Sequence, residues 1–438
     1  MVVWGDTIAA IATAPGRGGV AVVRVSGSEA FSIAERLTGI RDQGPGIRVG
    51  RIANVDEGVI LFFKGPHSYT GEDVVEFQCH GGTVTPRRVL EACLAAGARL
   101  ARRGEFTERA FLNGKLDYDQ AESVLDLIDA KTARAADAAL EGLSGRKRRE
   151  LKSLYDSALD LSTRLEHALD VDEGELADDY VRELGSQISD LRSRISGALR
   201  RANEGKILRE GALVVLAGPP NAGKSSLMNA LLEENRAIVS DIPGTTRDSI
   251  EEWLDLDGWP IRLVDTAGLR TSQDEVEGEG VRRAEDLIAK ADLVLWLRNS
   301  EAGEPLNGSI AQLLNRLTSQ TLNLSTKCDL VRGPGLNVSA KTGEGLDELK
   351  REIVAKLKEK AETSVVDLPE GNFVALREAL TLLETGEGQE TGDGRREEDL
   401  VLTANAVRAA AERLGAAIGV TYSSNLLDNL FSRFCVGK

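Results

Sequence analysis

The 438-residue sequence has no apolar run that approaches the roughly 18 residues a membrane-spanning helix needs. Residues 1–6 lack the basic start and the long apolar centre of a signal peptide. The sequence also lacks a Gly-x-Gly-x-x-Gly fingerprint placed after a strand pattern, so we do not expect this chain to hold a dinucleotide cofactor itself. These absences predict a cytoplasmic protein that makes no use of a membrane.

Cysteine is scarce and scattered. No two cysteines have metal-type pair spacing, which disfavours both a disulfide framework and a zinc site. We therefore expect free thiols at Cys79, Cys93, Cys328 and Cys435. No histidine lies beside Cys435 in the sequence to activate it, so we expect a small buried thiol there rather than a nucleophile.

Positive charge is in deficit, because 54 basic residues face 70 acidic ones and the formal net charge is -16. Phosphate neutralisation dominates nucleic-acid affinity, so this balance disfavours a protein that holds RNA through a general basic surface. An RNA substrate would therefore require help from a partner. Basic clusters occur at Arg99–Arg103, Arg146–Arg149 and Arg192–Arg201. Such clusters are typical of solvated helix faces.

The length of the chain predicts a multidomain protein, since roughly 150 residues per domain suggests about three domains. Residues 1–117 combine β-branched runs with many glycines, which is typical of strands joined by tight turns. The clearest runs are Gly19–Val25, Val59–Phe63 and Val74–Phe77. We predict an α+β domain for this part, and the chain shows no strong internal repeat.

The rest of the chain changes pattern twice. Over residues 118–210, apolar residues recur at steps of three and four, which predicts long antiparallel helices of an all-α domain. The same spacing returns from Leu400 to Ile418. We therefore predict one helical domain, formed by residues 118–210 and 361–438, into which residues 211–360 are inserted. The polar, glycine-rich stretch Glu384–Glu398 is predicted to be a mobile connection.

The inserted segment opens on a phosphate-binding loop. Gly218–Ser225 follows the buried strand pattern Ala212–Ala217 and precedes a helix, which is the setting that this motif requires. Glycines let backbone N–H groups point at phosphate oxygens, Lys224 reaches the β- and γ-phosphates in a catalytic role, and the Ser225 hydroxyl binds Mg²⁺. This predicts an α/β P-loop GTPase domain of the Ras-like type. The nucleotide contacts predicted in the loop are Asn221, Ala222, Gly223, Lys224, Ser225 and Ser226.

Three further motifs follow in the order that a GTPase requires. Asp265–Gly268 ends the strand pattern Ile261–Val264, which places Asp265 near Mg²⁺ and the Gly268 amide near the γ-phosphate. Thr326–Asp329 resembles the guanine-reading motif, although most GTPases carry Asn at its first position. Its aspartate accepts two hydrogen bonds that adenine cannot donate, so GTP is the expected nucleotide. With the base-contacting loop Ser339–Lys341, the predicted contacts are Asp265, Thr266, Ala267, Gly268, Thr326, Lys327, Asp329, Ser339, Ala340 and Lys341.

A switch-type loop lies between the phosphate-binding loop and Asp265–Gly268, and its Thr246 hydroxyl can complete the Mg²⁺ shell. Leu269 follows Gly268, where small signalling GTPases place a glutamine that orients water. A leucine side chain cannot orient water, so another group must supply that function and the positive charge of the transition state. The nucleotide contacts predicted in the switch loop are Ser240, Asp241, Ile242, Pro243, Gly244, Thr245 and Thr246.

Several motifs that generic GTPases do not predict accompany this site. They are the Asn221 loop, Gly244–Asp248, the tail Phe434–Lys438, and the N-terminal motifs Pro15–Gly19, Ser68–Asp73, His80–Gly82 and Gly104–Asp117. Through them the chain resembles the tRNA modification GTPase MnmE (TrmE) family over essentially its whole length. The family tail normally reads Cys-Ile-Gly-Lys, so Val436 is a conservative departure.

The resemblance implies that a potassium ion acts where other GTPases use an arginine finger. The ion would be held by the Asn221 side chain and the carbonyls of Ser240, Ile242 and Thr245. A fixed cation that bridges the phosphates neutralises charge as it develops. The resemblance also implies a homodimer whose G domains face each other across their nucleotides, with dimerisation ordering the switch loop. The family's remote glutamate that orients the attacking water falls on Glu277.

For the N-terminal part, the resemblance implies a folate-binding-like domain that binds 5-formyl- or 5,10-methylene-tetrahydrofolate at the dimer interface. The family's folate contacts fall on Arg24, Glu76, Lys115 and Lys438. A pterin edge presents donors and acceptors that a carboxylate can pair, and basic groups suit the glutamate tail of folate.

The implied function is GTP hydrolysis coupled to the addition of a carboxymethylaminomethyl-type group at C5 of wobble uridine 34 in certain tRNAs. A flavoprotein partner, MnmG (GidA), would form a heterotetramer with the chain and contribute FAD and NADH, and hydrolysis would drive conformational change. Two alternatives stay open. A ribosome-assembly GTPase shares the switch motif and Leu269 but usually carries a basic RNA-binding module, and a G-domain switch with a folate sensor would have no RNA role.

Overall fold

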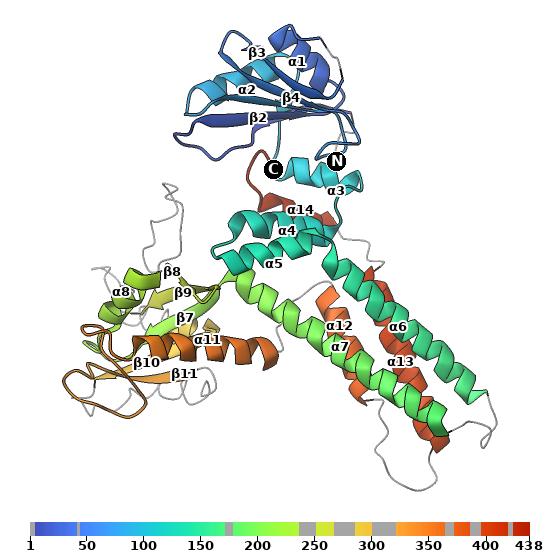
Figure 1. Cartoon of the computed structure of the whole chain (residues 1–438), viewed down its shortest axis with the longest axis vertical. Coiled ribbons are helices and arrows are strands. Elements are labelled where there is room, and N and C mark those ends of the chain that lie inside the picture. The colour runs from blue at the N-terminus through green and yellow to red at the C-terminus, as the bar shows by residue number, and fades with distance from the viewer. Residues whose placement is uncertain are drawn as a thin grey trace. The chain divides into compact units, whose positions relative to one another are not determined.

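The structure is a computed structural model that describes residues 5–41, 44–170, 178–235, 251–266, 285–299, 321–363, 372–385, 396–418 and 424–438. The chain divides into two compact units (Figure 1). The first is formed by Met1–Leu125, Gly142–Gly145 and Thr421–Lys438, and the second by Asp126–Glu141 and Arg146–Val420. None of the helices within the described ranges is both long and apolar enough to cross a membrane.

The first unit contains a six-stranded sheet with strand order β3-β4-β5-β2-β1-β6. Neighbouring strands are antiparallel except β1 and β6, which are parallel. The strands are β1 (Ile8–Ile11), β2 (Val20–Ser26), β3 (Gly46–Ile52), β4 (Asp56–Phe63), β5 (Val74–His80) and β6 (Arg99–Leu100). The three strand runs expected from the sequence are therefore confirmed as β2, β4 and β5.

One face of this sheet is covered by α1 (Ala30–Thr38) and α2 (Thr85–Ala95), whose apolar residues share a core with Val23, Ile60 and Phe77. Side chains alternate between the two faces of a strand. The neighbours of these core residues therefore lie on the opposite face.

On that opposite face, the strand register places Ile47, Leu61, Glu76 and Arg24 in one row across four strands. The Ile47 side chain lies in edge strand β3 and is 66% exposed. This face therefore combines exposed apolar residues with a charged pair.

The C-terminal tail belongs to the same unit. Helix α14 (Ser424–Ser432) shares a small apolar core with α4 (Tyr118–Asp129). After it, the Phe106 N–H in α3 (Glu105–Leu112) donates to the Lys438 carbonyl at 3.2 Å. A Cβ added at Gly437, where φ is 103°, would lie 2.2 Å from the Ile11 carbonyl oxygen, so only glycine lets the tail pass this close to β1. The last residue is thereby fixed beside the N-terminal sheet.

The second unit contains a six-stranded sheet with strand order β12-β11-β10-β7-β9-β8, parallel except for the β8–β9 pair. Its strands are β7 (Ala212–Ala217), β8 (Glu251–Leu256), β9 (Trp259–Asp265), β10 (Leu293–Asn299), β11 (Thr321–Thr326) and β12 (Leu336–Val338). Every residue of β7 is buried, because its alternate side chains enter two different cores. Burial on both faces is typical of a parallel sheet.

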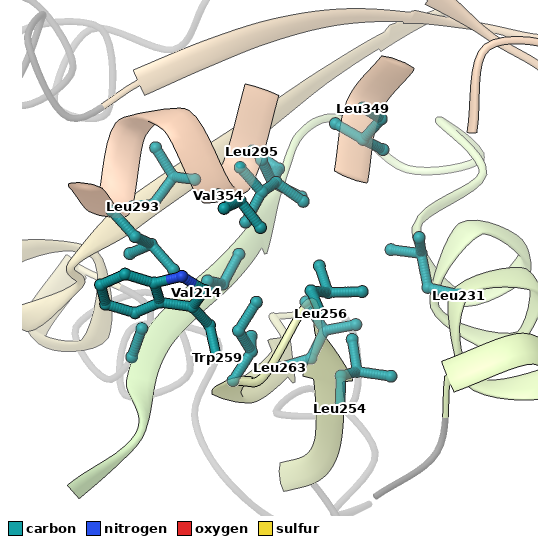
Figure 2. Packing of buried hydrophobic residues seen from close by; sticks show 14 of the residues in the cluster. Val214, Leu231, Leu254, Leu256, Trp259, Leu263, Leu293, Leu295, Leu349 and Val354 are labelled. Carbon is teal, nitrogen blue, oxygen red and sulfur yellow. The ribbon is translucent and has the colours of Figure 1, made fainter. Parts of the chain in front are cut away.

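The larger of these two cores is shown in Figure 2, where Val214 and Leu293 lie near the Trp259 ring and Val354 lies near Leu295. Val354 comes from α11 (Leu346–Thr363), and Leu227 of α8 (Lys224–Asn235) belongs to the same core. A sheet covered by helices that follow its strands is the α/β arrangement predicted from the sequence.

Four long helices before and after this sheet share a separate apolar core. They are α6 (Arg146–Leu169), α7 (Asp178–Glu210), α12 (Asn372–Thr385) and α13 (Arg396–Ile418). Segments on both sides of the α/β region therefore build one helical bundle, and the predicted fold class is confirmed. The limits 1–117, 118–210, 211–360 and 361–438 stay predictions.

The mobile connection expected over Glu384–Glu398 is wrong at both ends. Glu384 and Thr385 end α12, and Arg396 begins α13. The Thr385 hydroxyl donates to the Thr381 carbonyl at 3.0 Å, which continues the helical pattern despite the polar sequence. Residues 386–395 lie outside the described residues.

The turn between β8 and β9 contacts α5 (Ala133–Leu143). The Thr132 hydroxyl donates to the Gly258 carbonyl at 2.8 Å and accepts from the Ala135 N–H at 3.2 Å, so it also caps the helix. The Arg134 guanidinium lies 4.4 Å from the centre of the Trp259 ring. The α/β sheet is therefore attached to a helix that precedes it in the chain.

Candidate functional site

The phosphate-binding loop connects β7 to α8, as its motif predicts. Its backbone has positive φ angles at Gly218 (151°), Asn221 (61°) and Gly223 (85°). A Cβ at Gly218 would lie 2.4 Å from the Leu297 carbonyl oxygen, so glycine is required there. Asn tolerates the left-handed conformation better than most side chains. Loops of this kind form concave sites for anions.

Two residues at the start of α8 carry the predicted phosphate and metal chemistry. The Lys224 ammonium donates to the carbonyls of Gly218 and Pro219 at 3.0 and 2.9 Å, so it lies over the loop. The Ser225 hydroxyl donates to the Asp265 carboxylate at 2.7 Å. Oxygen donors of this kind are the ligands that Mg²⁺ prefers. The structure thus joins the predicted Mg²⁺ residue to its expected neighbour.

Thr326 connects the base motif to the phosphate-binding loop. Its buried hydroxyl lies 2.7 Å from the Ala222 carbonyl oxygen and 3.1 Å from that of Arg298. With Thr326 in place of the usual Asn, the base motif therefore still contacts the phosphate-binding loop directly. The Thr266 hydroxyl likewise donates to the Leu216 carbonyl at 2.9 Å, which fixes the end of β9 beside β7.

The two predicted base-contacting segments also lie together. The Ser339 hydroxyl donates to the Asp329 carboxylate at 2.7 Å, and the Cys328 N–H donates to the Val338 carbonyl at 3.3 Å. Ser339 is buried, whereas Asp329 and Lys341 are exposed. The carboxylate is therefore oriented by a fixed neighbour and still faces outward.

Several predicted site residues lie outside the described residues, and their roles stay predictions. They are Ser240, Asp241, Ile242, Pro243, Gly244, Thr245, Thr246, Ala267, Gly268 and Glu277. The predicted potassium site is therefore represented here by Asn221 alone, which is exposed.

A second polar site occupies the N-terminal sheet. Arg24 of β2 and Glu76 of β5 are opposite in register, and the Arg24 Nε donates to the Glu76 carboxylate at 2.7 Å. The Arg24 guanidinium lies 5.4 Å from the centre of the Tyr69 ring and 5.6 Å from that of Phe106. Its Nη1 atom is buried and has no hydrogen-bond partner among the described residues. Such an orphaned donor indicates a place for a polar ligand.

Lys438 joins this site through the C-terminal tail. Burial lowers the pKa of its ammonium group, the charge of Arg24 lowers it further, and the Glu76 carboxylate opposes both effects. The fourth predicted folate contact, Lys115, donates instead to the Pro66 carbonyl at 3.0 Å. The structure thus brings three of the four residues together, while the Lys115 side chain contacts the loop that leads to Tyr69.

Comparison with known proteins covers both sites. Residues 7–115 match the family model described as GTP-binding protein TrmE N-terminus, and residues 119–435 match the MnmE helical domain. The chain belongs to the MnmE family. The tRNA modification GTPase MnmE of Symbiobacterium thermophilum is 42% identical over 465 residues, which span 99% of each chain. The protein of the same name from Azoarcus sp. is 42% identical over 452 residues, spanning 99% of this chain and 98% of its own.

Among solved structures, the G domain of the T. maritima FeoB iron transporter is 29% identical and covers 33% of this chain and 98% of its own, with a TM-score of 0.24. Membership of the MnmE family makes the chain a GTP hydrolase. It also gives the P-loop, the base motif and the N-terminal motifs one common explanation.

Sequence reasoning missed two residues at the N-terminal site of this MnmE family member. Tyr69 and Phe106 form its aromatic walls, and the Tyr69 hydroxyl lies 2.9 Å from that of Thr107. Burial raises the pKa of Tyr69. Tyr69 lies in the motif Ser68–Asp73, and Phe106 lies in the motif Gly104–Asp117. An aromatic residue within each of these motifs is the sequence signal for this site.

The prediction that Cys435 is a buried thiol is wrong. The other three cysteines are buried, but Cys435 is exposed. It lies beyond α14, where its carbonyl accepts a hydrogen bond from the Lys438 N–H at 3.4 Å. A tail segment held by its backbone leaves the side chain free to face outward.

Proposed function

We propose that the chain hydrolyses GTP in order to add a carboxymethylaminomethyl-type group to C5 of wobble uridine 34 in certain tRNAs. It would act in the cytoplasm with a flavoprotein of the MnmG type, which contributes FAD and NADH. The observation that carries the proposal is the buried Nη1 of Arg24 beside Glu76 and Lys438, which has no hydrogen-bond partner in the part of the chain that the structure describes. A ribosome-assembly GTPase would have no need of this second site.

At the nucleotide site, the role of each residue follows from its charge and its hydrogen-bonding groups. Lys224 now donates to neutral carbonyls, and phosphate oxygens would replace these acceptors with stronger, charged ones. Ser225 and Asp265 would hold Mg²⁺, which supplies charge neutralisation on the phosphates. Asp329, oriented by Ser339, accepts the two guanine donors.

Two further roles are part of the proposal. Asn221 sits in the left-handed backbone of the loop, and its exposed side chain would bind potassium. Glu277 would orient the attacking water. Small signalling GTPases use a glutamine for this role, but this chain has Leu269 at that position. The cation would act only when the switch loop supplies the remaining carbonyls, which links hydrolysis to dimerisation.

At the N-terminal site, we propose a tetrahydrofolate that carries the one-carbon unit. Glu76 offers a carboxylate to the donor edge of a pterin, and the Arg24 Nη1 offers a donor to its acceptor edge. The rings of Tyr69 and Phe106 supply apolar surface. Lys438 lies beside this pair, where burial and the charge of Arg24 lower the pKa of its ammonium group, and it offers a further donor to the folate.

The uncovered face of the N-terminal sheet supports a homodimer. Ile47 and Val49 are 66% and 71% exposed in edge strand β3, and Ile47 lies in the same row as the Arg24–Glu76 pair. Exposed apolar residues gathered on one face are typical of an interaction surface. A second copy on this face would cover the apolar residues and close the folate site from one side.

The proposal is tested first by GTP hydrolysis of the purified chain in potassium and in sodium at equal ionic strength. Dimerisation is followed in parallel with a transition-state mimic. Potassium-selective stimulation together with dimer formation supports the nucleotide site as proposed. Equal rates in the two salts remove the potassium site and favour a ribosome-assembly GTPase.

The tRNA part of the proposal needs a separate measurement. Modified nucleosides are quantified in tRNA from a strain that lacks the gene. We expect the C5 side group of wobble uridine to be lost. Unchanged nucleoside levels would instead favour a regulatory switch with a folate sensor.

A further inference from the structure

Positive charge in this acidic chain is concentrated on two helix segments, residues 146–152 of α6 and 192–206 of α7. Together they carry ten basic residues and only two acidic ones, although the whole chain has a net charge of -16. We call these two segments the basic surface. The remainder of the chain is correspondingly more acidic.

The two segments lie side by side in an antiparallel pair of helices. Arg201 forms an ion pair with Glu150, and Arg194 donates to the hydroxyls of Ser153 and Ser157 at 2.9 and 3.0 Å. Arg146–Arg149 are all exposed. An open groove of about 480 Å³ follows the same part of α6 and is lined by Arg149, Lys152, Ser153, Asp156, Ser157 and Asp160. Basic groups and hydroxyls thus lie close together here, beside the carboxylates of Asp156 and Asp160.

The apolar core of the helical bundle does not require this concentration of charge. The bundle core is filled by an apolar stripe that includes Leu151, Leu154 and Ala158, and the basic residues lie outside it. Arg146–Arg149 occupy the first turn of α6, where the positive end of the helix dipole disfavours cations by about 0.3–1 kcal/mol each. The arrangement therefore weakens the helix in which it is placed.

Neighbouring groups contact most of these basic side chains. Arg146 pairs with Glu141 and Lys152 with Asp156, while Asp190 and Glu362 lie 3.7 and 4.0 Å from Arg194 and Arg200. Ion pairs between exposed side chains contribute about 0–1 kcal/mol, so phosphate groups compete with them readily.

We propose that the basic surface binds the phosphate backbone of the tRNA, an inference that rests on the proposed tRNA substrate. Residues 146–157 span roughly 17 Å of helix, long enough for several phosphates. Backbone contacts fix orientation without selecting sequence, which suits an enzyme that acts on more than one tRNA. The acidic remainder of the chain repels RNA and so restricts docking to this surface.

The test compares two triple variants of the full-length chain. Lys147→Gln/Arg148→Gln/Arg149→Gln neutralises part of the basic surface. The control, Arg351→Gln/Lys356→Gln/Lys358→Gln, makes the same change of charge on α11. Affinity for an unmodified tRNA transcript is measured by fluorescence anisotropy at several salt concentrations, and circular dichroism checks that both variants keep their helix content.

We expect the basic-surface variant to bind tRNA at least roughly tenfold more weakly, with a salt dependence reduced by about one unit per lost phosphate contact. The control should match the wild type. Equal affinity and equal salt dependence in the two variants would overturn the inference. So would a basic-surface variant that retains tRNA affinity but no longer binds the flavoprotein partner, because the surface would then serve an acidic protein.

Failure of this inference is distinct from failure of the proposed function. If the gene-deletion strain loses the wobble-uridine side group while the basic-surface variant binds tRNA like the wild type, the function stands and the surface is wrong. If the strain retains the side group, the proposed function itself fails.

Discussion

The buried carboxylate of Glu105 offers a quantitative test of how the N-terminal unit is held together. The side chain is 0% exposed and accepts hydrogen bonds from Arg99 Nη1 at 2.9 Å, the Arg102 N–H at 2.8 Å and Arg109 Nη2 at 3.2 Å. Glu105→Gln keeps the shape but replaces one acceptor oxygen with a donor. The new amide group would face guanidinium donors that it cannot satisfy.

The size of the effect follows from the pKa of this carboxyl group. Burial alone raises that pKa, but the hydrogen bonds and charges of Arg99, the Arg102 amide and Arg109 outweigh burial and lower it from 4.5 to about 2. Each pKa unit corresponds to about 1.4 kcal/mol, so the ionised group contributes roughly 3 kcal/mol to stability. Because the folded pKa is the lower one, this stability is complete above about pH 4.5 and is lost as the pH falls toward 2.

Hydrogen exchange of peptides that span residues 99–112, in the full-length chain, measures this contribution. We expect Glu105→Gln to lower the opening free energy by about 3 kcal/mol at pH 7, and the gap to the wild type to narrow at pH 3. The control Glu91→Gln changes a side chain that is 59% exposed and pairs with Arg87 in α2. Equal protection of Glu105→Gln and wild type at pH 7 would refute the reasoning.

Three other substitutions test separate contacts. Asn221→Ala should lower potassium-stimulated hydrolysis by roughly a hundredfold and leave GTP affinity nearly unchanged, and stimulation that persists in a potassium titration would contradict the ion assignment. Asp329→Asn should weaken GTP binding by about 3 kcal/mol in calorimetry, because two charge-assisted hydrogen bonds are lost, and retained affinity would mean that the base binds elsewhere. Thr132→Val removes the hydroxyl bonded to Gly258 and should destabilise the β8–β9 turn by about 1 kcal/mol in hydrogen exchange, with unaltered exchange as the contrary result.

The nucleotide site was predictable from the sequence because its chemistry lies in short contiguous motifs. The P-loop needs only a strand, eight residues and a helix, and the structure places Lys224 and Ser225 where the motif requires them. Local periodicity also predicted β7 from an unbroken apolar run. What these motifs could not give was the contact between Thr326 and Ala222, which joins residues 104 positions apart.

The N-terminal site depends on long-range register, which the sequence does not reveal. Arg24 and Glu76 become partners only because β2 and β5 pair in one register, and Lys438 arrives from the other end of the chain. Helical periodicity was also incomplete as a guide. Ile128 shares the spacing of Ala121 in α4, yet Ile128 is 48% exposed whereas Ala121 is buried. Periodicity predicts which side chains share a face of a helix, but not how far along the helix a neighbouring element covers that face.

The turn between β8 and β9 attaches one side of the nucleotide site to the helical segment at Thr132. β8 begins directly after the switch loop, and β9 ends at Asp265 beside Ser225. Because the far end of this hairpin is clamped by Thr132, the two strands cannot slip past each other without breaking that hydrogen bond. Since β9 is also paired with β7 up to Asp265, we expect a movement of Asp265 to be transmitted along the hairpin to Thr132 and the start of α5.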